Sequence, residues 1–449
     1  MTFSHPADSN LSTRLLQTLT PEQGRLLRSV AEEAARQHFP LYIVGGFVRD
    51  LLLGHPCLDF DLVIEGDATS FARSLSKKYG GTTTSHTRFG TAVWSLEGTG
   101  LASSQILSGE PVNMQPANML TLDFISARSE SYEHPAALPA VKPGALADDL
   151  RRRDFTINTL ALRLDGEHFG EFRDDLGGLK DLQAGLIRVL HPGSFVDDPT
   201  RLFRAVRYEQ RYGFHIASET MALIPEALVF IGKLSAERVR HELDLILEEK
   251  KADSMLKRLA ELDMLAAAHP TLEWKQTAQS RFVNGMTAAL TLEHALSQRM
   301  LGWTLWLMDV PLSSLKNIEK RLHFESGLRD LLLAAVTLMT EVNSLAGKKT
   351  SQCVAVLDAV LLNAVQAVYL GLPVGPARQV LYDYLETWRH VKPKTTGHDL
   401  KKRGLPQGPV YKSILQRLRA AWLDGEVATV EEEMGLLDKL LKNIVEGDQ

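Results

Sequence analysis

Short apolar segments alternate with amphipathic ones along the first 150 residues of the chain. Apolar runs that predict β-strands lie at residues 42–44, 60–64, 81–87, 92–95 and 122–127. Residues 21–37 and 68–79 instead repeat apolar side chains with the period of a helix, the first of them from a proline onward. Strands interleaved with helices predict an α/β or α+β domain built on a mixed sheet.

The pattern becomes almost wholly helical from Asp148 onward. Apolar residues recur at heptad-like intervals over residues 234–247, 252–265, 288–306 and 328–345. A linker at 390–396 precedes a last pair of predicted helices. Residues 1–20 are polar and are predicted to be loose, and the segments 102–118 and 130–147 are irregular and contain several prolines. We therefore predict a sheet-containing head followed by an all-α remainder.

The composition is that of an ordinary globular protein, and 449 residues suggest roughly three domains. No apolar run reaches the roughly 18 residues of a membrane helix, and the N-terminus lacks the charge pattern of a signal peptide. Cys57 and Cys353 lie far apart, so we expect no disulfide framework, no zinc site and a cytoplasmic location. With a net charge of −5, local basic groups must hold any nucleic-acid partner.

The first candidate chemistry lies in the segment LYIVGGFVRDLLLGHPCLDFDLVIE. Gly45 and Gly46 end an apolar run, where their backbone N–H groups can face a phosphate. Asp59 and Asp61 project from one side of a strand because side chains alternate, and Asp123 on another strand is a candidate third carboxylate. Although a turn and a solvated strand edge remain alternatives, the apolar neighbours favour a Mg²⁺ site for a nucleoside triphosphate.

A second candidate cluster begins with three consecutive arginines, Arg151 to Arg153. Asp154 and Asn158 then share one face of a predicted helix. That face can bind a ribose hydroxyl while one arginine reaches the triphosphate. A solvated basic patch is the alternative.

A third cluster lies on a helix predicted to start near Pro199. Arg201, Arg204 and Arg207 drift slowly around one side of this helix. Asp198 and Arg201 together offer acceptors and forked donors that match the edge of a nucleotide base. A structural ladder of ion pairs is the alternative.

A fourth cluster is the glycine-punctuated basic turn at residues 396–409. It carries Lys401, Lys402 and Arg403, and the next predicted helix carries Lys412. Cations and backbone N–H groups in such turns can hold an RNA backbone. An ordinary corner between two helices fits the same pattern equally well.

These clusters together resemble the class II tRNA nucleotidyltransferases of the polymerase β superfamily, enzymes that build or repair the 3′ CCA end of tRNA. The resembling segments are VGGFVRDLLLG with DFDLVIEG, RRRDFTINTLA, DDLGGLKDLQAGLIRVL, FVDDPTRLFRAVRY and SAERVRHEL. They follow the order of the family over about residues 41–245, and TGHDLKKRGLPQGPVYKSIL resembles its C-terminal region. The resemblance implies a head, neck, body and tail, which we assign to residues 21–150, 151–250, 251–390 and 391–449.

The resemblance also implies roles for the phosphate-side residues. Asp59 and Asp61 correspond to the metal-binding carboxylates of the family. Gly46, Arg49 and Arg153 correspond to contacts with the incoming nucleotide. The implied reaction is attack of the tRNA 3′-hydroxyl on the α-phosphate of CTP or ATP, with two Mg²⁺ ions stabilising the departing pyrophosphate.

Base choice is implied to lie elsewhere in the chain. Asp198 and Arg201 correspond to the amino-acid template that pairs with cytosine or adenine, so no nucleic-acid template is needed. The acidic pair here is Asp197-Asp198, where the family has Glu-Asp. Glu237 and Arg238 correspond to a motif that stabilises the template helix.

The product stays open between full CCA addition, which we favour, and addition of the terminal A alone. Residues 129–147 resemble the loop that the family uses to switch to A addition, which disfavours a CC-only enzyme. A poly(A) polymerase would carry a strongly basic C-terminal extension, which this sequence lacks. An idle RNA-binding protein is disfavoured because Asp59 and Asp61 are both present. The sequence leaves monomer and homodimer equally open.

Overall fold

The computed structural model describes residues 10–56, 60–86, 90–97, 99, 121–131, 133–134, 139–290 and 296–447. The chain divides into two compact units. Unit 1 comprises Met1–Ser235 with Leu262–Ala267, and unit 2 comprises Ala236–Glu261 with Ala268–Gln449. Cys57, Asp59 and the segment 102–118, for which we made predictions, lie outside the described residues.

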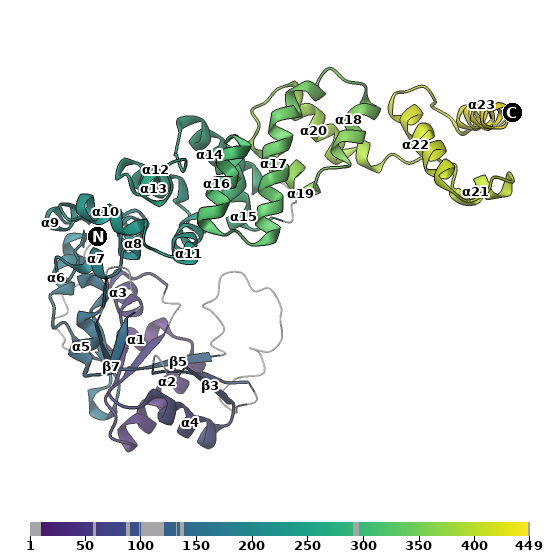
Figure 1. The fold of residues 1–449 in the computed structure, drawn as a ribbon. Coiled ribbons are helices and arrows are strands. Elements are labelled where there is room, and N and C mark those ends of the chain that lie inside the picture. Colours follow the sequence, from purple (N-terminus) through teal and green to yellow (C-terminus); the bar gives the residue numbers. More distant parts are fainter. Residues whose placement is uncertain are drawn as a thin grey trace. The chain divides into compact units, whose positions relative to one another are not determined.

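Unit 1 is built on a seven-stranded sheet (Figure 1). The strands lie in the order β3 (Thr82–His86), β4 (Thr91–Ser95), β5 (Thr121–Ser126), β2 (Asp61–Ile64), β1 (Leu41–Val44), β8 (Ala161–Arg163) and β9 (Glu171–Arg173). Strands β2 and β5 are parallel, and the other neighbouring strands are antiparallel. The predicted mixed sheet is therefore confirmed.

The structure corrects three predictions about unit 1. Strands β8 and β9 belong to the sheet, although we predicted an all-α chain beyond Asp148. Strands β6 (Arg128–Ser131) and β7 (Ala140–Pro143) form an antiparallel hairpin in the segment that we predicted to be irregular. Helix α1 (Ser12–Thr18) buries Leu15 completely, so this part of the N-terminus is not loose. Strands of three or four residues are too short to show a clear alternation in the sequence.

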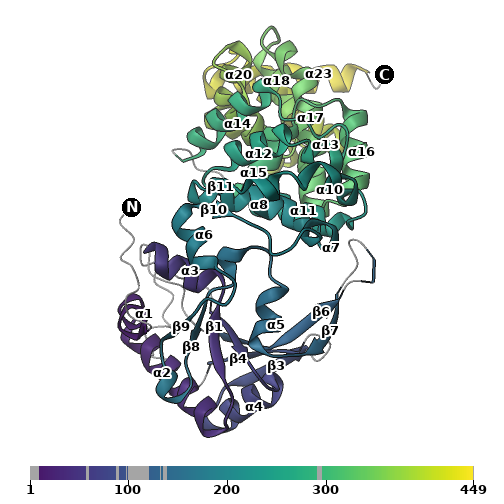
Figure 2. The same ribbon diagram turned by 90° about the vertical axis from the view of Figure 1, so that its left-hand side faces the viewer.

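Two helices cover opposite faces of the sheet (Figure 2). Helix α4 (Ala68–Tyr79) packs its Phe71 edge-to-face against Phe124 of β5, with ring centroids 5.3 Å apart. Helix α5 (Leu146–Arg151) packs Leu150 against the other face, which includes Val63 of β2. Side chains alternate along a strand, so Asp61 lies on the face that α5 covers farther along β2.

The other elements of unit 1 are short helices and one pair of two-residue strands. They are α2 (Pro21–Arg36), α3 (Gly46–Leu53), η2 (Thr156–Asn158), η3 (Gly166–His168), α6 (Gly178–Ala184), β10 (Leu186–Ile187), α7 (Ser194–Asp197), α8 (Thr200–Tyr212), β11 (His215–Ile216), α9 (Ser218–Met221) and α10 (Ile224–Ile231). Helix α13 (Met264–Ala268) lies where the chain returns to this unit. Helices α2, α4 and α8 confirm the predicted positions.

Unit 2 is wholly helical over its described residues. Its helices are α11 (Ala236–Leu247), α12 (Ala252–Glu261), α14 (Gln276–Ala289), α15 (Gln298–Leu307), α16 (Leu312–Leu322), α17 (Ser326–Leu345), α18 (Thr350–Leu357), α19 (Leu362–Gly371), α20 (Pro376–Glu386), η4 (Trp388–His390), α21 (Gly397–Lys402), α22 (Pro409–Leu423) and α23 (Val430–Gly447). The single helix predicted over 288–306 is wrong, because α14 ends at Ala289 and α15 begins at Gln298. The predicted last pair of helices is a group of three.

A buried carboxylate fixes the linker that precedes these last helices. Glu433 of α23 is 1% exposed and accepts hydrogen bonds from the backbone N–H groups of Lys394 (2.9 Å) and Thr395 (2.6 Å). It also accepts from the indole N–H of Trp422 on α22. Burial acts to raise the pKa of Glu433, but these donors outweigh it and lower the pKa. The carboxylate thus joins the linker, α22 and α23.

No single helix within the described ranges is both long and apolar enough to cross a membrane. In the described part of the chain, α18 and α19 meet that measure only when taken together, and they are bent by 115° at the break between them.

Glu33 provides a test of how α2 is held against α4. Its carboxylate is 1% exposed, pairs with Arg36 and contacts Lys78 of α4 at 2.9 Å, and these groups lower its pKa from 4.5 to about 2. Glu33→Gln should therefore cost about 1 kcal/mol at neutral pH. Because the folded pKa is depressed, the difference from wild type should shrink as the pH falls from 4.5 towards 2.

Amide hydrogen exchange of α2 and α4 in both proteins, measured from pH 7 downward, checks this prediction. A stability difference that stays constant through the acid range would contradict it.

Candidate active site

One end of the sheet brings together groups from three strands. Strand β1 is antiparallel to both β2 and β8, with Ile43 opposite Leu62 and Val44 opposite Ala161. The end of β1 therefore lies beside the start of β2 and the start of β8. The Gly45 N–H donates to the carbonyl of Leu160 at 2.9 Å, which fixes the turn after β1 against the residues before β8.

Two carboxylates lie side by side at this end of the sheet. Asp61 of β2 is paired in register with Asp123 of the parallel strand β5. Neighbouring strands are about 4.8 Å apart, so both carboxylates project from the same face at a spacing suited to a shared divalent cation. Asp61 is partly exposed and Asp123 exposed, so the pair is open to solvent.

Two carboxylates alone do not make a complete metal site. Among the residues that the structure describes, no group of three or more His, Cys, Asp or Glu side chains is placed to hold an ion. Asp59, our other predicted ligand, lies outside them. The donor set of Asp61 and Asp123, hard oxygens on adjacent strands, fits a cation such as Mg²⁺.

The glycine turn faces an arginine. Gly45 has a φ of +74°, and a Cβ placed there would lie 2.5 Å from Nη1 of Arg153. Arg153 donates to the fully buried carboxylate of Asp149 at 3.1 Å, and its own Nε is buried without a hydrogen-bond partner. The predicted phosphate contacts Gly45 and Arg153 thus meet, and a side chain at position 45 would push the guanidinium aside.

Arg49 of α3 is 3% exposed and firmly held. Its Nε and Nη2 donate to the two carboxylate oxygens of Asp50, at 3.0 and 2.9 Å. Its Nη1 donates to the side-chain oxygen of Asn158 at 2.6 Å, and the rings of Tyr208 and Tyr212 flank it at 5.1 and 4.7 Å. Gly46 lies beside it, because a Cβ there would be 3.4 Å from Nη2. Two predicted nucleotide contacts, Arg49 and Asn158, are therefore in direct contact.

Asp154 and Asn158 meet, although not as we predicted. They do not share a regular helix, since α5 ends at Arg151 and η2 begins at Thr156. Asn158 nevertheless donates to Asp154 at 2.8 Å. Burial alone would raise the pKa of Asp154, but Arg204, with nitrogens 2.6 and 2.8 Å away, and Asn158 lower it to about 2. Asp154 is thus a charged carboxylate that holds Asn158 and Arg204 in place.

The predicted base-reading residues are arranged around the start of α8. Asp198 accepts hydrogen bonds from the backbone N–H and the hydroxyl of Thr200, at 3.0 and 2.7 Å. Arg201 is 5% exposed and donates to the hydroxyl of Ser194 and the carbonyl of Arg152, both at 2.6 Å. The guanidinium of Arg201 therefore fixes two backbone segments next to α8. Arg207 of the same helix is also 5% exposed.

The β6–β7 hairpin is connected to this region by Arg152. Its Nη1 contacts Glu130 of β6 at 3.1 Å, while its Nη2 contacts Asp149 at 2.6 Å. The carbonyl of the same residue accepts from Arg201. Glu130, in the segment predicted to switch base choice, is thus connected to the predicted base-reading residue Arg201 through Arg152.

Sequence reasoning missed the residues that hold the predicted ones. Tyr208 and Tyr212 have no spacing that marks them, since their partner Arg49 is distant in the sequence. Asp50 is adjacent to Arg49, and Asp149 precedes Arg152 and Arg153 by three and four residues, so both were visible as nearby opposite charges.

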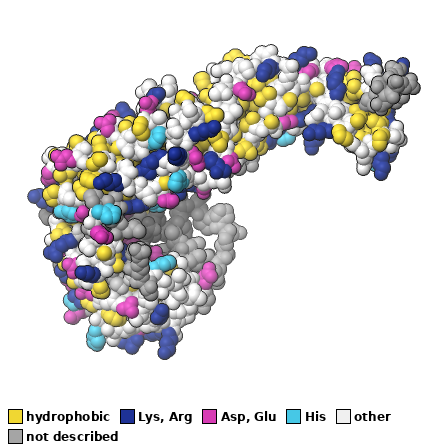
Figure 3. Space-filling model, viewed as in Figure 1, with side chains coloured by type: hydrophobic (Ala, Val, Ile, Leu, Met, Phe, Trp, Pro, Cys, Tyr) yellow, Lys and Arg dark blue, Asp and Glu magenta, His cyan; other side chains and the backbone are white. Residues whose placement is uncertain are grey.

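The remaining predicted residues belong to unit 2. Lys401 and Lys402 end α21 and are exposed, as is Lys412 of α22, whereas Arg403 forms an ion pair with Asp438 of α23. Figure 3 shows Lys and Arg side chains scattered among acidic and apolar ones on the face it presents. RNA binding by these lysines stays a prediction, and so does the stabilising role of Glu237 and Arg238, which lie on α11.

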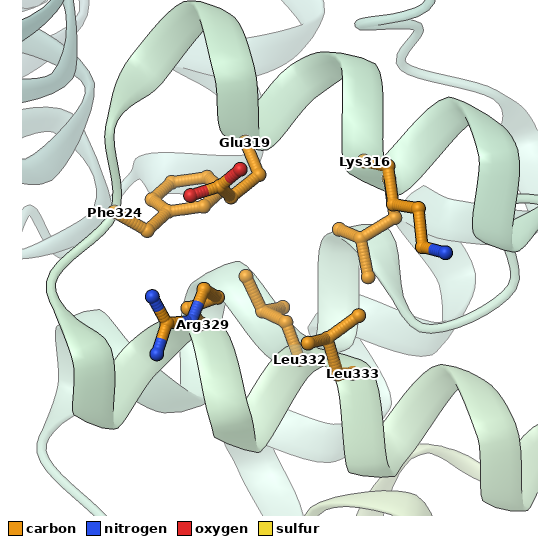
Figure 4. Close-up of a pocket in the computed structure, with 7 residues that line it drawn as sticks. Lys316, Glu319, Phe324, Arg329, Leu332 and Leu333 are labelled. Carbon is orange, nitrogen blue, oxygen red and sulfur yellow. The ribbon is translucent and has the colours of Figure 1, made fainter.

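A pocket of about 70 Å³ lies between α16 and α17 of unit 2 (Figure 4). Leu315, Phe324 and Leu332 form apolar walls, while Glu319 and Arg329 lie at its rim. None of the predicted site residues lines it.

Comparison with known proteins identifies the class and then the family. Residues 41–188 match the Poly A polymerase head domain, and residues 213–275 match the probable RNA and SrmB-binding site of polymerase A. The nucleotidyltransferase class that the carboxylate pair and glycine turn suggested is thereby confirmed.

Relatives extend this match along the whole chain. The A-adding tRNA nucleotidyltransferase of Halalkalibacterium halodurans is 31% identical, covering 95% of this chain and 94% of that protein. The A-adding tRNA nucleotidyltransferase of Geobacter sulfurreducens is 33% identical over 92% of this chain, which spans only 47% of that protein. The CCA-adding enzyme of Thermotoga maritima complexed with tRNA-CCA has a TM-score of 0.76 at 27% identity, covering 97% of this chain and 98% of that one. The chain belongs to the tRNA nucleotidyltransferase family, as its motifs predicted.

The glycine turn yields a paired prediction. Gly45→Ala should add backbone strain of about 1–3 kcal/mol and push the Arg153 guanidinium out of place. Gly54→Ala is the matched control, because Gly54 also has a positive φ, +70°, but has open space around its Cβ position. We expect both variants to lose stability, but only Gly45→Ala to lose ATP binding, by at least about tenfold.

Thermal melting and equilibrium ATP binding of the two variants test this prediction. Equal losses of ATP binding in both would show that strain, and not the Arg153 contact, is responsible.

Proposed function

We propose that the chain is a template-independent tRNA nucleotidyltransferase that adds or repairs the 3′-terminal CCA of tRNA with CTP and ATP. The observation that carries the proposal is the register of Asp61 with Asp123, next to the turn at Gly45 and Gly46. Carboxylates for a cation and N–H groups for phosphate are the parts that nucleotidyl transfer requires.

Asp61 and Asp123, with Asp59, would hold Mg²⁺. When bound, this ion supplies positive charge to the phosphate oxygens during in-line displacement. Gly46 would direct its backbone N–H group to the triphosphate, since the Gly45 N–H already donates to the carbonyl of Leu160, and Arg153 would neutralise the triphosphate. Arg49 fixes the orientation of α3, whose first residue is Gly46.

The reaction joins a nucleotide to the tRNA and releases pyrophosphate. The tRNA 3′-hydroxyl oxygen forms a bond to the α-phosphorus of the nucleotide, and the bond from that phosphorus to the β-phosphate oxygen breaks. Pyrophosphate leaves, and the hydroxyl proton passes to solvent. The tRNA thus grows by one nucleotide.

Asp198 and Arg201 would select the base, since an Asp oxygen and an Arg fork can match the donors and acceptors of cytosine and adenine. The hydrogen bonds of Arg201 to Ser194 and Arg152 would keep its guanidinium in one orientation. Lys401, Lys402, Arg403 and Lys412 would contact the tRNA backbone. We also place the enzyme in the cytoplasm.

Addition of the terminal AMP alone is the second candidate. The observation that favours it is that the two relatives described above, at 31% and 33% identity, are A-adding enzymes. The fold does not separate the two products, because both use the same head and the same α8.

One assay tests the function and separates its two forms. The protein is incubated with tRNA ending at the discriminator base, in C or in CC, with CTP and ATP offered separately and together. Extension of all three substrates to CCA supports the main proposal. Extension of the CC substrate alone identifies an A-adding enzyme, and extension of none overturns the proposal.

Asp61→Ala should abolish nucleotide incorporation and leave tRNA binding largely intact, because it removes a metal ligand and no RNA contact. Asp175→Ala is the control, since Asp175 only pairs with Arg173 at an exposed site. Primer-extension gels and filter binding measure the two activities. Normal incorporation by Asp61→Ala would remove Asp61 from the metal site.

Arg201→Lys should disturb base choice more than Mg²⁺ dependence. Lysine keeps the charge but cannot donate at once to Ser194 and Arg152, so the template geometry should relax. Competition of CTP and ATP against UTP and GTP measures the discrimination. Unchanged selectivity in a folded Arg201→Lys protein would refute the assignment of Arg201.

A further inference from the structure

Helix α8 carries the candidate base-reading residue Arg201 in its first turn, just after Asp198, and two tyrosines near its end. The last residue of the helix, Tyr212, reaches back to α3. Its hydroxyl donates to Oδ1 of Asp50 at 2.9 Å, and its ring lies 4.7 Å from the guanidinium carbon of Arg49. The ring also stacks on His55, which follows α3, at a centroid distance of 5.8 Å and an interplanar angle of 11°.

The hydroxyl of Tyr212 acts on the carboxylate that orients Arg49. Oδ1 of Asp50 accepts from both Tyr212 and the Nε of Arg49, while Oδ2 accepts from Nη2 of Arg49. A carboxylate held by a third group cannot rotate freely, so the guanidinium that it chelates is also held. Burial raises the pKa of the Tyr212 hydroxyl, so it remains a protonated donor at neutral pH.

The rings add a second restraint on the same guanidinium. Tyr208 lies 5.1 Å from Arg49, and its own hydroxyl accepts from Arg204 at 3.0 Å. Arg204 in turn pairs with Asp154. A guanidinium that is desolvated between aromatic rings gains more from them than an exposed one does. Arg49 is therefore fixed by groups of α8 and of its own helix together with Asn158.

We propose that Tyr212 is a positioning residue for the triphosphate, through Asp50 and Arg49, and that it joins the base-selecting helix to the phosphate site. The inference rests on the proposed function, in which Arg49 and Gly46 belong to the phosphate side. A shift of α8 on binding a base would then move the phosphate contacts as well. Base and phosphate recognition share one rigid element.

The test compares Tyr212→Phe, which keeps the ring and loses the hydroxyl, with Tyr212→Leu, which loses both. Tyr79→Phe, on α4 of the same unit, is the matched control. Equilibrium dissociation constants are measured with Mg²⁺ for ATP, CTP and inorganic tripolyphosphate, which has neither base nor ribose. No tRNA is needed, so the result does not depend on whether the protein extends tRNA.

We expect Tyr212→Phe to weaken binding of all three ligands alike, by about threefold to tenfold, the size of the net contribution of one typical hydrogen bond. Tyr212→Leu should weaken it further, and Tyr79→Phe should not change it. In the tRNA assay, Tyr212→Phe should raise KM for CTP and ATP while leaving kcat within about twofold.

Two results would overturn the inference. Unchanged tripolyphosphate binding with weakened ATP and CTP binding would place Tyr212 on the base or the ribose. Unchanged binding of all three ligands by Tyr212→Phe, with Tyr212→Leu losing only thermal stability, would make Tyr212 a packing residue. A wild-type protein that binds the ligands but extends no tRNA would instead count against the proposed function alone.

Discussion

The antiparallel pairing of β1 with β2 and β8 is the constraint on which the candidate site depends. Strand β1 ends where both neighbouring strands begin. The glycine turn, Asp61 and the residues before β8 therefore lie at the same end of the strands. A one-residue slip in this register would turn Asp61 to the opposite face, among the apolar side chains that pack on α4. The buried residues of β1 fix that register, and so they determine where Asp61 lies relative to the glycine turn.

Helix α8 shows how a polar site is kept stable inside a fold. Arg201 and Arg207 are almost fully buried, a costly position for a charge unless it is paired and hydrogen-bonded. Arg201 is hydrogen-bonded to a hydroxyl and a carbonyl, and the more exposed Arg204 is paired with Asp154. These bonds tie α8 to the segment that follows α5. Arg201 and Arg204, two candidate site residues, thus also hold α8 against its neighbours.

Much of the fold and of the candidate site was predictable from the sequence where the local pattern of residues determines the structure. Helix α4 follows its sequence periodicity, and Asp61 and Asp123 were recognised because charged residues are rare within apolar strands. The three-residue strands β8 and β9 were not predictable, since they are strands only through the pairing of β8 with β1 and of β9 with β8. The inward orientation of Arg201 and the contacts of Tyr212 with Arg49 also depend on distant segments. Spacing alone identified the motifs but could not show what holds each side chain in place.

The Glu433 carboxylate has a consequence for where the chain can be shortened. Removal of α23 would leave the backbone N–H groups of Lys394 and Thr395 and the indole of Trp422 without their acceptor. The linker would lose its anchor although it lies well before the deleted helix. Loss of the C-terminal helix would therefore loosen α21 and α22 as well, and a proteolytic cut near Val430 would release a larger piece of structure than the cut itself removes.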